Sequence, residues 1–120
     1  MAAPNIVNVS SIYGKTMGAA LTTTLTTTLL TCASEKLLKI NSIIVANIDG
    51  SSGADATISF YDGSSTWALA SAITVPAKTT LVVLGKDAPI YLEEADQLRG
   101  GASANSDLVV TISYEELDDA

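Results

Sequence analysis

The sequence contains no histidine and a single cysteine, Cys32. A Ser-His-Asp triad and a Cys-His pair both require an imidazole, so neither can form within this chain, and most hydrolase mechanisms are excluded. A zinc site of the usual four-ligand kind is excluded as well. One cysteine cannot form an internal disulfide, so the core and the hydrogen bonds must stabilise the fold. We therefore expect no enzymatic activity, no metal and no cofactor.

Charged residues are also scarce, at 16% of the chain against an average of about 25%. The formal net charge is −7, and residues 93–120 carry the imbalance, because they contain eight acids and only one cation, Arg99. Nucleic-acid binding needs clustered Lys and Arg, so we expect no nucleic-acid partner. A basic protein partner is compatible with this distribution. Because so few residues are charged, we expect part of the protein's surface to be covered.

The chain also lacks a long apolar run. No segment approaches the ~20 residues of a membrane-spanning helix, and the N-terminal MAAPNIVNV has no basic segment followed by an apolar stretch, so we expect neither a membrane partner nor a signal peptide. Assembly in the cytoplasm is compatible with the single cysteine. The 120 residues lie within the ~100–150 of a typical single domain, and no repeat or linker divides them, so we predict one domain over residues 1–120.

Every second residue near the C-terminus is apolar or aromatic: Leu108, Val110, Ile112 and Tyr114. This period of two is typical of a strand with one buried face. We predict that Ile112 and Tyr114 are core residues, and that Thr111 and Glu115 are not.

Other segments also favour strands: 5–13, 22–31, 38–48, 57–61, 67–75, 81–84 and 90–92. Residues 1–13 form either an extended arm or a first strand. Leucine spacing leaves 22–31 open to helix or strand, but seven of its ten residues are threonine, which suits a pleated surface, so we favour one long strand or two short ones. Asp62-Gly63-Ser64-Ser65 predicts a hairpin turn. About eight strands predict an all-β antiparallel sandwich, or jelly-roll-like domain, with the C-terminal strand paired centrally.

The strand predicted at 38–48 is apolar on both faces in its middle. One face would hold Leu38, Ile40, Ile44, Ala46 and Ile48. Ile43 and Val45 would lie on the other face, covered either by a loop or by another chain. The second alternative makes Ile43 and Val45 candidate interface residues and favours a homo-oligomer. Trp67, the only tryptophan, is a third candidate, because tryptophan is enriched at interfaces.

Two segments resemble ligand-binding motifs without matching them. Gly14-Lys15-Thr16 lacks the upstream glycine of a P-loop, whose place Val9 occupies, so we interpret Gly14 as a turn. The loop Asp49 to Asp55 lacks the alternating acids and the final glutamate of a calcium loop. Adjacent acids at 93–96 and 115–119 are interpreted as solvated carboxylates, since a glycosidase needs two carboxyls facing each other across a cleft.

Three segments resemble known proteins in their amino-acid sequence: MAAPNIVNV, KINSIIVANIDGSSGADATISFYD and IYLEEADQLRGGASANSDLVVTISYEE. They are similar to a group of small virion structural proteins of tailed bacteriophages, particularly phages of aquatic bacteria. The resemblance covers nearly the whole chain and carries no functional residue. It implies a capsid cement or decoration protein that clamps neighbouring capsomers. Its partners would be the major capsid protein or other virion proteins, and it would act as a homotrimer within the virion.

Two alternatives remain open. The first is a structural component of the tail or baseplate. The second is a carbohydrate-binding β-sandwich, which the sequence disfavours because its six aromatic residues are scattered and do not form the aromatic face usual in such domains.

Overall fold

The computed structural model describes residues 9–119, and the side chains of residues 10–118. Within this part, the chain forms no helix and nine strands: β1 (Val9–Ala20), β2 (Thr27–Thr31), β3 (Lys36–Asn47), β4 (Ala54–Tyr61), β5 (Thr66–Val75), β6 (Thr80–Leu84), β7 (Ile90–Leu92), β8 (Gln97–Ala102) and β9 (Leu108–Asp119). The all-β prediction is confirmed. The prediction for residues 1–8 lies outside the described residues.

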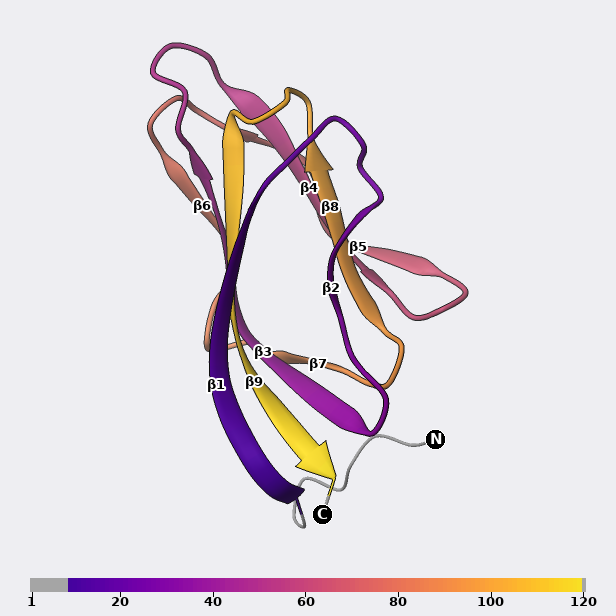
Figure 1. Ribbon diagram of the computed structural model, residues 1–120. Coiled ribbons are helices and arrows are strands. Elements are labelled where there is room, and N and C mark those ends of the chain that lie inside the picture. The colour runs from indigo at the N-terminus through magenta and orange to yellow at the C-terminus, as the bar shows by residue number, and fades with distance from the viewer. Residues whose placement is uncertain (1–8, 120) are drawn as a thin grey trace.

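The strands build two antiparallel sheets that lie face to face (Figure 1). In sheet A the described strands follow the order β1-β9-β3-β6, and β7 also pairs with β3. In sheet B the order is β2-β8-β4-β5. The predicted antiparallel sandwich is therefore confirmed. The C-terminal strand β9 lies between β1 and β3, which is the central pairing that its alternation predicts.

The core lies between the two sheets. Its largest fully buried side chains are Leu21, Leu38, Ile40, Ile43, Val45, Ile58, Val75, Leu92, Leu98, Leu108, Val110 and Ile112. The predicted phase of β9 is confirmed, because Ile112 is buried and Thr111 is only partly covered. Tyr114 packs against this core but stays partly exposed.

A β-bulge in β3 changes which of its side chains face the core. Against β9, Ile40 pairs with Tyr114 and Ser42 pairs with Ser113, so Asn41 is an extra residue. A bulge of this kind reverses the alternation of every residue beyond it.

The bulge corrects the predicted faces of β3. Ile43 and Val45 are fully buried in the core, whereas Ile44 lies on the opposite side of the sheet. The prediction that Ile43 and Val45 need cover from outside this domain is therefore wrong, because sheet B covers them.

The threonine-rich segment is only partly a strand. β2 spans Thr27–Thr31 alone, and the residues before it form a loop whose backbone packs on Gly101 of β8. This loop is tied to β8 by a 2.7 Å hydrogen bond from the Ala102 amide to the Thr22 carbonyl. Gly101 lies beneath it, and a Cβ there would come within 2.5 Å of the Thr24 carbonyl oxygen. The absent side chain therefore lets the loop pack onto the sheet.

The first described strand is longer than predicted. β1 runs without interruption through Gly14, which pairs with Glu115. The interpretation of Gly14 as a turn is wrong, since its backbone continues the ladder with β9.

Candidate interaction surfaces

The outer face of sheet A carries a continuous patch without charge, which we call the uncharged face. Cross-strand partners share a side of the sheet, so the register identifies its members. Ile44 aligns with Thr111 of β9 and Val82 of β6, and Thr111 in turn aligns with Gly18. Among the residues whose side chains are described, the uncharged face comprises Thr16, Gly18, Ala20, Ser42, Ile44, Ala46, Thr80, Val82, Val109, Thr111 and Ser113.

The uncharged face is apolar at its centre and bordered by charge. Val82 is 61% exposed and is the register partner of Ile44. Lys39 and Glu115 are register partners at one end of the face, and Asp107 lies in the turn before β9 at the other. An apolar centre with a polar rim is the usual composition of a protein-binding surface.

The size of the uncharged face limits what it can bind alone. Neighbouring strands lie ~4.8 Å apart and alternate side chains ~6.8 Å apart, so its eleven positions cover roughly 350 Å². A stable pairwise interface needs about 800 Å² from each partner. One copy of this face therefore supports a weak contact, and stable attachment requires several copies acting together.

The three residues predicted as an interface are not brought together. Ile43 and Val45 lie in the core between the sheets, while Trp67 lies on β5 of sheet B with 57% of its surface exposed. Ile44 and Val82 were missed, because strict alternation places Ile44 on the same face as the buried Ile40. Val82 lies in an uninterrupted apolar run, so alternation could not show which of its residues face the core.

Trp67 is held in place by the turn of the β4–β5 hairpin, which projects from the sandwich in Figure 1. Its indole Nε1 donates to Asp62 Oδ2 at 3.1 Å. The other oxygen, Oδ1, accepts the backbone amides of Ser64 and Ser65 at 3.0 and 2.8 Å. These donors, the Ser65 amide first, hold the pKa of the Asp62 carboxyl well below its usual range. The exposed indole is therefore fixed by the turn. The antiparallel pairing of β4 with β5 confirms the predicted hairpin.

Several acids of the C-terminal region are engaged inside the chain. Lys36 forms ion pairs with Asp118 and, at 3.9 Å, with Glu116, which also pairs with Lys15 at 3.3 Å. The hydrogen bond to Asp118 raises the pKa of Lys36. Glu94 accepts the backbone amide of Glu35 at 2.7 Å. These carboxylates are not simply solvated, and their engagement reduces the negative charge available to a basic partner.

The single cysteine is a core residue. Cys32 is buried, and its Sγ donates to the Lys36 carbonyl at 3.1 Å. Burial raises the pKa of its thiol to about 11. The thiol therefore stays protonated at neutral pH and is a poor nucleophile.

Other kinds of site were also sought. In residues 9–119, no group of three or more His, Cys, Asp or Glu side chains is placed to hold a metal ion. No helix in that range is long and apolar enough to cross a membrane. No protein-family model matches the chain, and no curated protein matches it in sequence.

Proposed function

We propose that this protein is a structural component of a tailed-phage particle, where it acts as a capsid cement or decoration protein that clamps neighbouring capsomers. The observation that carries the proposal is the uncharged face, an exposed patch that is apolar at its centre and whose nearest charges lie at its rim. The resemblance of the sequence to small virion proteins supplies the kind of partner. Its location would be the virion, and its partner the major capsid protein or another virion protein.

The limited area of the uncharged face favours a trimer as the working unit. Three copies of a roughly 350 Å² patch present about 1,000 Å², which exceeds the ~800 Å² of a stable interface. Linking three weak contacts makes the second and third intramolecular, so attachment strengthens without any new contact. The small area of the uncharged face therefore replaces the exposure of Ile43 and Val45 as the reason to expect an oligomer.

Copy number in purified particles tests the proposal. Quantitative mass spectrometry would compare this chain with the major capsid protein. A cement protein should be present in hundreds of copies, since it follows the capsomers. A few to a few dozen copies would instead favour the tail or baseplate alternative, and absence from the particle would contradict both.

A further inference from the structure

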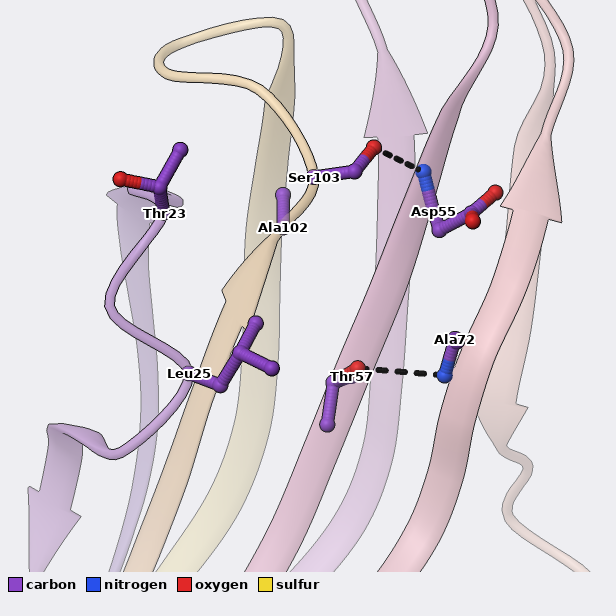
Figure 2. A pocket seen from close by; sticks show the side chains of 7 residues that line it. All are labelled: Thr23, Leu25, Asp55, Thr57, Ala72, Ala102 and Ser103. Carbon is purple, nitrogen blue, oxygen red and sulfur yellow. Dashed lines mark hydrogen bonds between the residues drawn. The ribbon is translucent and has the colours of Figure 1, made fainter.

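A pocket of about 250 Å³ opens on the outer face of sheet B, on the opposite side of the sandwich from the uncharged face. Figure 2 shows its lining. The loop before β2 contributes Thr23 and Leu25. Strands β4 and β5 contribute Asp55, Thr57 and Ala72, and the end of β8 contributes Ala102 with Ser103 beyond it.

Two local irregularities build this pocket. The loop that carries Leu25 can lie against β8 only because Gly101 has no side chain. Across the sheet, β5 has a bulge opposite Thr57, and Ala72 adopts a left-handed backbone with a φ of 50°. Such a conformation is costly for a residue with a Cβ, and in strands it often accompanies a functional site. The Ala72 amide is satisfied by the side chain of Thr57, at 3.1 Å.

The polar groups of the pocket retain hydrogen-bonding capacity. Thr57 Oγ1 accepts the Ala72 amide, and Ser103 Oγ accepts the Asp55 amide at 2.8 Å. In both bonds the hydroxyl oxygen is the acceptor, so each hydroxyl keeps its own proton to donate. Asp55 Oδ1 accepts the Thr74 hydroxyl at 2.8 Å, which leaves the second carboxylate oxygen able to accept from a ligand.

These groups restrict the chemistry of a ligand. Asp55 is the only charged residue that lines the pocket, so an anion would meet uncompensated repulsion. Figure 2 shows the Thr23 hydroxyl directed away from the other lining residues, so the Thr57 and Ser103 hydroxyls are the donors that need acceptors on the ligand. The carboxylate needs a donor. A ligand hydroxyl both donates and accepts, whereas an ammonium group only donates. The volume lies below the ~300–1,000 Å³ typical for drug-sized ligands, which limits the ligand to a single ring.

We propose that this pocket binds one neutral polyhydroxyl ring, such as a hexopyranose unit, through Asp55, Thr57 and Ser103. A ring hydroxyl donates to the Asp55 carboxylate, which makes a charge-assisted hydrogen bond. Neighbouring ring oxygens accept from Thr57 and Ser103. The apolar side of the ring packs on Leu25, which is 46% exposed. Because the pocket and the uncharged face lie on different sheets, this binding does not depend on the proposed role in a particle.

Titration of the isotope-labelled protein with methyl glycosides, followed by amide chemical shifts, tests the proposal. The probes are the methyl glycosides of glucose, galactose, mannose and N-acetylglucosamine. We expect at least one to give saturable shifts at Asp55, Ala72 and Ser103, with a Kd of about 1 mM, appropriate for a ligand of about a dozen non-hydrogen atoms. A parallel titration with the free hexose separates two sources. Equal binding shows that the anomeric oxygen can carry a substituent, as it does at the end of a glycan, whereas binding of the free hexose alone indicates a free sugar.

Variants locate the binding in the pocket. Asp55→Asn should weaken it about tenfold or more, because a neutral amide replaces the charged acceptor. Asp87→Asn, in the turn after β6, is the matched control and should leave the Kd unchanged. If Asp55→Asn does not fold, Leu25→Ala removes the apolar wall from a surface loop and should also weaken binding.

Three results would overturn the proposal. One is the absence of saturable shifts for every glycoside and free hexose up to about 100 mM, a hundredfold above the expected Kd. Another is binding that persists unchanged in both pocket variants. The third is saturable binding of n-butylammonium without any sugar, which would assign the pocket to an amine.

Discussion

Cys32 links the core to a measurable pH dependence. Its folded-state pKa of about 11 exceeds the ~8.5 of an unfolded thiol. Between these values the unfolded state has released a proton that the folded state still holds. The free energy of unfolding should therefore be unaffected by this group below about pH 8.5 and fall as the pH rises towards 11.

Chemical denaturation at a series of pH values checks this expectation. Cys32→Ala is the control, since it removes the thiol while other groups continue to titrate. The variant should lose stability less steeply than the wild type between about pH 9 and 11. Equal slopes would show that the thiol is not protected by burial.

Two adjacent residues of β3 provide a test of the bulge. Ile43→Ala should lower the free energy of unfolding by about 2–4 kcal/mol, because it opens a cavity in the core. Ile44→Ala, on the uncharged face, should cost less than about 1 kcal/mol. Urea denaturation measures both. A larger cost at Ile44 than at Ile43 would mean that the alternation of β3 is assigned in the wrong phase.

The sequence predicted the buried face of β9 correctly from Leu108 to Ile112, although Tyr114 is only partly buried, and it predicted β3 only up to its bulge. In β9, Leu108 to Ile112 alternate without interruption, so the period of two gives the buried face directly. In β3, apolar residues occupy both phases after Asn41, so hydrophobicity fits either assignment. The phase is set by pairing with β9, a contact between residues about 70 positions apart, and local patterns do not contain that information.

The loop that precedes β2 depends on one glycine of another strand. A Cβ at Gly101 would lie 2.8 Å from both the Thr22 carbonyl oxygen and the Leu25 Cα, so backbone atoms would have to move. Gly101→Ala should therefore destabilise the protein by about 2 kcal/mol through overpacking.

Gly14→Ala is the matched control in a strand. A Cβ at Gly14 has no neighbour within 4 Å, so the change should alter stability by less than about 0.5 kcal/mol. Thermal unfolding of both variants makes the comparison. Similar melting temperatures would show that the loop adapts freely and does not rest on β8.

The sequence predicted secondary structure correctly where interactions between neighbouring residues determine it. The β4–β5 hairpin is one such case, since the Asp62 side chain accepts the backbone amides of Ser64 and Ser65 within the turn. The segment 22–31 is the opposite case. Its threonines suit a strand, but residues 22–26 form a loop because they pack on the face of sheet B above Gly101. Tertiary packing here overrides β propensity.

The proposed function predicts the oligomeric state of the purified protein. If three uncharged faces must act together, the purified protein should form a trimer at micromolar concentration. Sedimentation equilibrium should then give a mass three times the 12.3 kDa of one chain. A single species at the mass of one chain would contradict the trimer and leave the attachment area too small for a stable clamp.

The same proposal makes the uncharged face responsible for attachment. Val82→Asp places a carboxylate at its exposed centre, where a bound partner would bury it without a counter-charge. Thr66→Asp is the control, because Thr66 is exposed on β5 of sheet B. Both variants should keep a melting temperature close to that of the wild type, since neither residue is in the core.

Incorporation of these two variants into particles, quantified against the major capsid protein, is the most direct test of this account. We expect the Thr66→Asp protein to reach the wild-type copy number, and the Val82→Asp protein to fall about tenfold or more, as for a loss of ~1.4 kcal/mol or more in binding. Equal incorporation of the two folded variants would contradict attachment through the uncharged face.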